Sequence, residues 1–352
     1  MASRAETIRK ATEAARQDFY HYTMKQEDEI LLIYRNAAED VGRAIAATAK
    51  DDLVTLGRLN GLNKQIHEEM VRLNVSLNAK IRQSMRRSVD LGMRSSIYGM
   101  QSAGLYTGGD PAAGRLTVQP GRGPVKVQVG TSYTAKSGQV HRFTPALELF
   151  SDSTWSAINT QAMDHLLKFR PGGLTLSDTI WDVTYQQEKY LRRQITQAVL
   201  QGKSAAKLSR EMRNSLQEPN RLFRRVRGKD GKLRWSRAAK AYHPGTGVYR
   251  SSYKNAMRVT RTEMNRAYHE GAVRYAQEKE WIDGAIWRLG NIDACEICVG
   301  LADKFYPKDD IPQIPHPHCM CHIEWHIDGD AVPEHGESPE KVAAAAAVGE
   351  PA

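Results

Sequence analysis

The sequence predicts a mainly helical α+β protein, on the strength of three observations. Apolar residues recur at helical spacing through most of the first hundred residues and again between residues 178 and 275. Short alternating stretches near residues 125–143 and 225–235 are typical of β-strands. All four cysteines fall within one 27-residue stretch, from Cys295 to Cys321. The expected architecture is therefore long helices, a small β insertion, and a C-terminal helix-plus-strand module built around the cysteines.

Length and charge set the first limits on function. At 352 residues the chain suits two domains rather than one. Lysines and arginines number 50 against 40 aspartates and glutamates, which gives a formal net charge of +10. This surplus favours an acidic partner such as nucleic acid, although many soluble proteins of similar charge bind none. The sequence has no apolar leader and no run of about 18 apolar residues, so we expect synthesis in the cytoplasm and no membrane contact.

Residues 1–98 are predicted to form long helices. Two stripes of apolar side chains recur three and four positions apart, and only Glu27 interrupts the first. Gly57 and Gly61 mark the expected break between the stripes. The pattern favours an antiparallel helical pair packed on itself over a coiled coil between chains. The stripes are Tyr20, Met24, Leu31, Tyr34, Ala38, Val41, Ile45 and Ala49, then Leu59, Leu62, Ile66, Met70, Leu73, Leu77 and Ile81.

Glycine and proline punctuate residues 99–145, so this segment cannot hold a long helix. Val125, Val127 and Val129 alternate with polar residues, as in a half-buried strand, and a second extended stretch covers residues 132–143. We predict a small β insertion or arm here. It is expected either to contact a neighbouring subunit or to be a simple surface hairpin.

Helix is predicted to return over residues 146–220. Apolar residues at helical spacing cover residues 178–200 and 203–216, with Gly202 between them. This arrangement favours a helical hairpin over a DNA-binding helix-turn-helix.

Residues 221–250 are predicted to form a basic hairpin or loop. Asp230-Gly231 is a strong turn signal between two short alternating stretches, and Phe223 and Trp235 are available to stack on bases. Because no base-reading motif is present, binding to double-stranded DNA would be sequence-independent and sensitive to salt. Contact with an acidic protein surface and a solvated loop are the alternatives. The candidate nucleic-acid-binding residues are Arg221, Arg224, Arg225, Arg227, Lys229, Lys232, Arg234 and Arg237.

The cysteine cluster has the spacing of a metal site. Cys295-x-x-Cys298 can present two thiolates to one Zn²⁺, and a histidine- and cysteine-rich group follows about 20 residues later. Thiolate together with imidazole suits Zn²⁺ better than Mg²⁺ or Ca²⁺. Four reduced, metal-free cysteines or a disulfide pair are the alternatives. Six candidates compete for four places, and the sequence leaves the set open: Cys295, Cys298, His316, His318, Cys319 and Cys321.

The predicted zinc is structural rather than catalytic. A catalytic zinc keeps an open coordination position beside a general base, and the chain has no His-Glu-x-x-His pair to supply one. Cys295 and Cys298 are the firmest ligands, joined by one or both of Cys319 and Cys321, with His316 as the favoured imidazole. His322, Glu324 and His326 then alternate as a strand leaving a zinc knuckle would.

A helix is predicted from Arg258 to Trp281. Its buried stripe carries Val259, Met264, Ala267, Tyr268, Ala272 and Tyr275. Four arginines at positions 258, 261, 266 and 274 lie largely outside that stripe. Arg261 and Glu263, two residues apart, cannot face each other on a helix. Structural ion pairs with other partners are favoured over phosphate contacts.

The order of these features resembles the C-terminal region of phage Mu F-like minor head proteins, the phage head morphogenesis family. The pattern is an Arg-Thr-Glu helix, a Trp-bearing strand, Cys-x-x-Cys, an Asp-Gly-Lys-Phe-like turn and His-x-x-Cys-x-Cys. The resemblance covers roughly residues 175–326, including the helical hairpin. The matching residues are Arg261-Thr262-Glu263, Trp287, Cys295–Cys298, Ala302-Asp303-Lys304-Phe305 and His316–Cys321.

The resemblance implies a virion protein rather than an enzyme. Members of the family are minor capsid proteins that join the procapsid at low copy, associate with the portal protein and other capsid proteins, and can contact packaged DNA. The resemblance therefore implies assembly in the host cytoplasm and a final place in the capsid interior or at the portal vertex. The alternatives are a zinc-supported HNH-like nuclease and a sequence-tolerant cytoplasmic DNA-binding protein.

Two features differ from the family pattern. Met320 stands where the family commonly has arginine between its last two cysteines, and the basic segment lengthens the gap before the Arg-Thr-Glu helix. Both bear on a shared DNA contact and leave the zinc site intact. Residues 251–327 are assigned to the Mu F-like module, and the acidic, alanine-rich residues 328–352 to a disordered tail.

Overall fold

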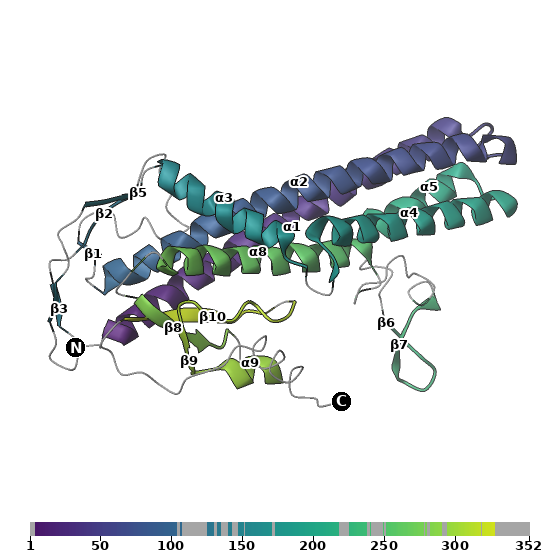
Figure 1. Ribbon diagram of the computed structural model, residues 1–352. Helices are drawn as coiled ribbons and strands as arrows, with labels where there is room; N and C mark the ends of the chain where they lie inside the picture. Colours follow the sequence, from purple (N-terminus) through teal and green to yellow (C-terminus); the bar gives the residue numbers. More distant parts are fainter. Residues whose placement is uncertain are drawn as a thin grey trace, which may run out of the picture. The chain divides into compact units, whose positions relative to one another are not determined.

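The computed structural model confirms a mainly helical α+β fold (Figure 1). The described residues are 4–103, 106–107, 125–129, 132–134, 140–142, 147–150, 152–170, 173–217, 225–237, 240, 249, 251–277, 279, 282–290, 294–317 and 319–327. The helices are α1 (Arg4–Thr48), α2 (Leu56–Ser102), α3 (Asp152–Lys168), α4 (Leu176–Leu200), α5 (Ala205–Gln217), α8 (Ser252–Gln277) and α9 (Glu296–Leu301). The predicted tail at 328–352 lies outside the described residues.

The strands form small antiparallel sheets. One sheet has the order β1-β2-β5 and another β10-β8-β9, and β3–β4 and β6–β7 are two-stranded. The strand predicted at residues 125–129 is β2, and β3 and β4 lie within the second predicted extended stretch, residues 132–143. The bounds are β1 (Tyr106–Thr107), β2 (Val125–Val129), β3 (Ser132–Thr134), β4 (Val140–Arg142), β5 (Leu147–Phe150), β6 (Arg225–Arg227), β7 (Leu233–Trp235), β8 (Ile282–Arg288), β9 (Phe305–Pro307) and β10 (His322–Ile327).

The chain divides into two compact units. Unit 1 combines residues 1–24, 83–168 and 261–352, and unit 2 combines residues 25–82 and 169–260. The helices α1, α2 and α8 therefore contribute residues to both units. Among the described residues, no helix carries an apolar stretch long enough to cross a lipid bilayer.

In unit 2, α1 and α2 pair antiparallel, as the two stripes predict. Lys80 forms an ion pair with Glu29, while Thr48, at the end of α1, lies 3.5 Å from the side chain of Gln65. Every member of the second stripe from Leu62 to Ile81 is buried. The α4–α5 hairpin also lies in this unit and turns at Gly202, whose φ of +63° is a conformation that glycine adopts without strain.

Two details of the N-terminal prediction are wrong. The turn between α1 and α2 lies at residues 49–55, where Asp51 and Asp52 take positive φ, whereas Gly57 and Gly61 lie within α2. The first stripe is also displaced at its start. Tyr20 and Met24 are exposed, and Phe19 is buried instead, because this part of α1 faces Tyr268 of α8.

In unit 1, α2 and α8 approach each other through two glycines. A Cβ added to Gly92 would lie 1.9 Å from the carbonyl oxygen of Tyr268, and one added to Gly271 would lie 2.2 Å from that of Val89. Any larger residue would push the helices apart. Phe19, Leu91, Met264 and Tyr268 form a buried cluster at this contact, so the stripe predicted for α8 lies in the core.

Candidate metal centre

A three-stranded sheet carries the cysteine module. β8 is its central strand and pairs antiparallel with β10 and with β9, with Trp287 opposite Ile323. Arg288 fixes the end of β8 through ion pairs with Glu324 on β10 and with Asp303 in the turn after α9. Asp303 adopts a φ of +59°, and its N–H donates to the carbonyl of Trp287 at 2.9 Å. The sheet and this turn hold the segments before and after the cysteines in fixed positions.

The helix α9 brings the Cys-x-x-Cys pair to one side. Cys295 is the N-cap residue, and its carbonyl accepts the N–H of Val299 at 2.9 Å. Cys298 follows three positions later, so the two side chains lie on the same face of the first turn. Cys295 is exposed, whereas Cys298 is buried.

The structure brings five of the six candidate metal ligands together. Cys295, Cys298 and His316 form one group, and Cys298, Cys319 and Cys321 form a second, with the ligand atoms of each group within 4.8 Å of one another. The Nε2 atom of His316 lies 3.1 Å from Cys295 Sγ and 3.0 Å from Cys298 Sγ, and Cys298 Sγ lies 3.7 Å from Cys319 Sγ. Cys298 is therefore the centre of the cluster. His318 lies outside the described residues.

His316 is oriented as a ligand. Its Nδ1 lies 2.9 Å from the carbonyl oxygen of Pro317. Because a carbonyl only accepts hydrogen bonds, Nδ1 carries the proton and the Nε2 lone pair faces the thiols. A hydrogen bond of this kind is the usual way in which proteins fix the tautomer of a metal-binding histidine.

The thiols have divergent pKa values. Burial raises the pKa of Cys298 to about 12, while the hydrogen bond to Cys321 and then burial raise the pKa of Cys319. The pKa of Cys321 is lowered to about 5, mainly because Cys319 donates a hydrogen bond to its sulfur and also because the N–H of Gly290 does so. A metal ion that binds Cys298 must therefore displace its proton, and the same holds for Cys319 if it is a ligand.

The cluster fits a metal ion with a preference for sulfur and nitrogen. Two thiolates on one tetrahedral Zn²⁺ lie about 3.8 Å apart, which follows from a Zn–S bond of about 2.3 Å, and the separation of Cys298 and Cys319 is 3.7 Å. The sulfur–nitrogen distances to His316 would have to open to about 3.6 Å in the same geometry. The described residues thus form a Cys/His cluster that can hold a metal ion.

Two neighbours that the motif does not include hold the 319–321 segment. Asn265 on α8 donates from Nδ2 to the carbonyl of Cys319 at 2.7 Å. A Cβ added to Gly290 would lie 1.8 Å from the carbonyl oxygen of Met320, so this position has room only for glycine. In the sequence, an asparagine on the buried side of the Arg-Thr-Glu helix is only a weak indication of a functional role. The sequence does not indicate that Cys319 is its hydrogen-bond partner.

The charges of α8 pair mainly along the helix. Arg266 binds Glu263 at 2.6 Å, and Arg274 binds Glu270 at 2.9 Å. Burial raises the pKa of Glu263, and its pairing with Arg266 opposes this shift. The hypothesis of structural ion pairs therefore describes Arg266 and Arg274, and each finds its partner on its own helix.

The basic hairpin is the second predicted site. β6 and β7 pair antiparallel around Asp230-Gly231, with Arg225 opposite Trp235, and Gly231 has a φ of +73°. The described basic side chains of this hairpin are exposed: Arg227, Lys229, Lys232, Arg234 and Arg237. Arg234 forms an ion pair with Asp230 at 2.5 Å. Arg221 and Arg224 lie outside the described residues, as does the side chain of Arg225.

Comparison with known proteins adds no assignment: no family model, curated protein or solved structure matches this chain.

Proposed function

We propose that the Cys/His cluster holds one structural Zn²⁺. Cys295, Cys298 and His316 would supply three ligands, and Cys319 or Cys321 the fourth. The donor set supports this identity, because thiolate with imidazole favours zinc over oxygen-binding cations. It also supports a structural role, since four protein ligands close the tetrahedral shell and leave no position for substrate.

Metal analysis of the full chain tests the zinc site. We expect about one zinc per chain in protein purified under reducing conditions, and loss of zinc in Cys298→Ser, because Cys298 belongs to both groups. Cys319→Ser and Cys321→Ser identify the fourth ligand as the one whose loss weakens zinc binding more. His21→Ala, at an exposed position on α1, should keep its zinc. Wild-type protein without zinc would contradict the site.

We further propose that the protein is a minor head protein of the phage Mu F-like kind, which acts at the portal vertex during procapsid assembly. One observation carries the proposal: the features of the family pattern from the Arg-Thr-Glu helix onward lie together in unit 1. The Arg-Thr-Glu helix is α8, the Trp-bearing strand is β8, and the loop before β10 supplies the last cysteines. Asn265, two residues after Glu263, bonds directly to Cys319.

A binding assay with the portal protein tests this function. We expect the full chain to be retained by immobilised portal protein and to be present at low copy in finished particles. Cys298→Ser should lose portal retention together with its zinc, whereas His21→Ala should keep both. If zinc-loaded wild-type protein is absent from particles and from the portal eluate, the head-protein proposal fails while the zinc site stands.

A second proposed function is sequence-independent contact with double-stranded DNA through the β6–β7 hairpin. The supporting observation is the exposure of five basic side chains on a two-stranded ribbon that also presents Trp235, which is 37% exposed. Phosphate contacts from such a ribbon depend on charge and not on base sequence.

Salt-dependent binding to two unrelated duplexes tests the hairpin. Wild-type protein should bind both equally, and replacing Arg227, Lys229 and Lys232 with glutamine should reduce the slope of log K against log salt by about 0.9 for each phosphate that the variant no longer neutralises. The matched control replaces three basic residues on the long helices, Lys10, Arg43 and Arg72, and should keep the slope. Equal slopes in the two triple variants would contradict hairpin-mediated binding.

A further inference from the structure

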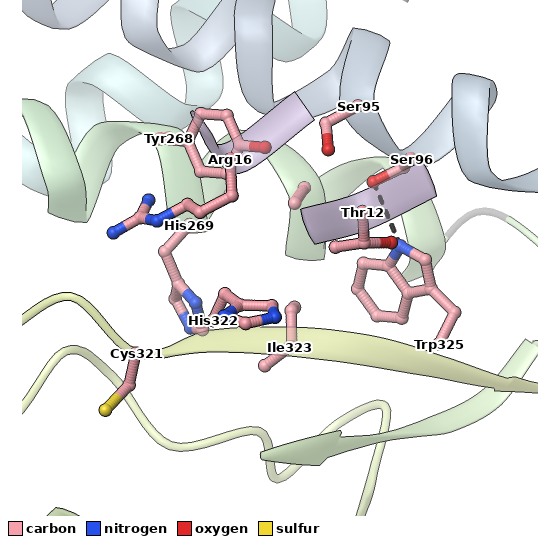
Figure 2. A pocket seen from close by; sticks show the side chains of 11 residues that line it. Thr12, Arg16, Ser95, Ser96, Tyr268, His269, Cys321, His322, Ile323 and Trp325 are labelled. Atoms are coloured by element: carbon pink, nitrogen blue, oxygen red, sulfur yellow. Dashed lines mark hydrogen bonds between the residues drawn. The ribbon is translucent and has the colours of Figure 1, made fainter. Parts of the chain in front are cut away.

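A small cavity in unit 1 lies beside the cysteine cluster (Figure 2). Its volume, as space open to the centre of a water molecule, is about 20 Å³. Residues of α1, α2, α8 and β10 form the wall, and Cys321 contributes to it as well. Figure 2 shows Arg16 and the rings of His269 and His322 toward one end, with Trp325 and Ser96 toward the other. The cavity is therefore lined by residues of both α1, the first helix of the chain, and β10, its last described strand.

Arg16 brings a buried charge to this cavity. The residue is 7% exposed, and neither its Nε nor its Nη2 atom has a hydrogen-bond partner. Its Cζ atom lies 5.2 Å from the ring centroids of both Phe19 and Tyr268. Contacts of a cation with aromatic faces compensate only part of the free energy needed to remove a guanidinium from water.

No carboxylate of the described residues offsets this charge. Burial lowers the pKa of Arg16, and the groups that oppose the shift are Tyr268, Cys319 and Cys321. Two buried histidines bring further polar atoms without a partner: Nδ1 and Nε2 of His322 and Nε2 of His269. A water molecule could satisfy several of these atoms but carries no charge to offset that of Arg16.

We propose that this cavity binds one small monovalent anion of the size of chloride, held by the unpartnered N–H groups of Arg16 and by a ring N–H of His322. The anion supplies a counter-charge that no carboxylate of the described wall provides. The cavity exceeds the roughly 10–15 Å³ that one water requires, which leaves room for a halide. A tetrahedral oxyanion such as sulfate or phosphate is too large unless α1 moves.

The site is distinct from the proposed zinc centre, although Cys321 lines the cavity. The thiolates of a metal-loaded cluster are the competing source of negative charge for Arg16. The two possibilities make different predictions, because a thiolate counter-charge is part of the chain, whereas a bound halide depends on the anion in solution.

Unfolding of the zinc-loaded full chain in different sodium salts at equal ionic strength tests the proposal. With chloride or bromide, the unfolding equilibrium constant should fall by the factor 1 + [anion]/Kd relative to gluconate, which is too large for the cavity. Sodium sulfate, at one fixed concentration, is a second reference salt whose anion is too large for the cavity.

Arg16→Met should abolish the difference between chloride and gluconate, whereas Arg9→Met, an exposed position on the same helix, should retain it. Identical wild-type unfolding in chloride and gluconate would overturn the proposal and assign the counter-charge to the thiolates.

A second measurement does not depend on whether Arg16→Met folds. Crystals of the wild-type chain grown in sodium bromide should show a bromide anomalous signal between Arg16 and His322. Density for water alone in the cavity, without an anomalous peak, would overturn the proposal.

Discussion

One side-chain hydrogen bond and one glycine without a side chain position the cysteine cluster. The bond from Asn265 to the carbonyl of Cys319 is buried and 2.7 Å long, and it connects α8 to the segment that holds two candidate ligands. Gly290 performs the same task by its lack of a side chain, since Met320 lies where its Cβ would be. The metal ligands therefore depend on residues outside the cysteine motif.

Asn265→Ala should weaken both stability and metal binding. The change leaves the carbonyl of Cys319 without its donor, which costs about 1–3 kcal/mol. Loss of a group that orients metal ligands typically reduces metal affinity by about 10–100-fold. Chemical unfolding and competition with a zinc chelator measure the two effects. Asn159→Ala is the matched control, because Asn159 donates to the carbonyl of Arg86 at an exposed position. Equal effects in the two variants would contradict a special role for Asn265.

At the residue scale the sequence predicts what local spacing determines. Cys295 and Cys298 are close in sequence, and the later group could be recognised by its residue types. Arg16 and Asn265 could not be recognised as neighbours of this cluster, because their proximity depends on the packing of α1 and α8. Only the three-dimensional arrangement brings residue 16 and residue 322 to one cavity.

The helices of unit 1 are placed by their close approach at small residues. Gly92 and Gly271 face backbone rather than flexible side chains, so the distance between α2 and α8 cannot relax around an added methyl group by side-chain movement alone. This contact also carries the buried cluster of Phe19, Leu91, Met264 and Tyr268.

Gly92→Ala should destabilise the protein by about 3 kcal/mol, the upper end of the usual range for overpacked cores. Gly61→Ala on the same helix should instead stabilise it by up to about 1 kcal/mol, because nothing lies within 4 Å of the added Cβ and alanine is the better helix former. Denaturant unfolding of both variants measures the difference. A neutral effect of Gly92→Ala would contradict the close approach of α2 and α8 at this residue.

Apolar periodicity predicted the helices well where one face is buried and the other is wet. The second stripe, from Leu62 to Ile81, is such a case. It predicted residues 19–24 of α1 less well, because Phe19 rather than Tyr20 faces Tyr268 of α8 there. The α1–α2 turn was also misplaced, since aspartates rather than glycines adopt the left-handed conformation.

At the scale of the whole molecule, the segments predicted from sequence composition do not coincide with the two compact units. The predicted segments follow changes of composition along the chain, whereas each unit combines pieces of several segments. The units could not be predicted from linker composition, because α1, α2 and α8 pass from one unit to the other without a change of pattern.

Removal of the metal should act on unit 1. With a chelator present, we expect faster amide hydrogen exchange in β8, β9 and β10, because the cluster connects the β8–β9 segment to the β9–β10 segment of this sheet. Exchange in α4 and α5 of unit 2 should stay the same. Mass spectrometry of peptides from the full chain makes the comparison, with Cys298→Ser as the metal-free reference. Equal acceleration in both units would show that they unfold as one.

Unit 1 is built from three separate stretches of the chain, and this constrains the order in which a nascent chain can fold. Unit 2 lies entirely within residues 25–260. The ribosome has therefore synthesised all of unit 2 before it reaches the C-terminal part of unit 1, which begins at residue 261. Arg16 and its neighbours on α1 must wait for β10 before their cavity can close. At usual translation rates this delay is on the order of tens of seconds. During that interval the side of α1 that packs on α8, including Phe19, lacks its partner. A chaperone or an early assembly partner has time to bind it before the cysteine module is made.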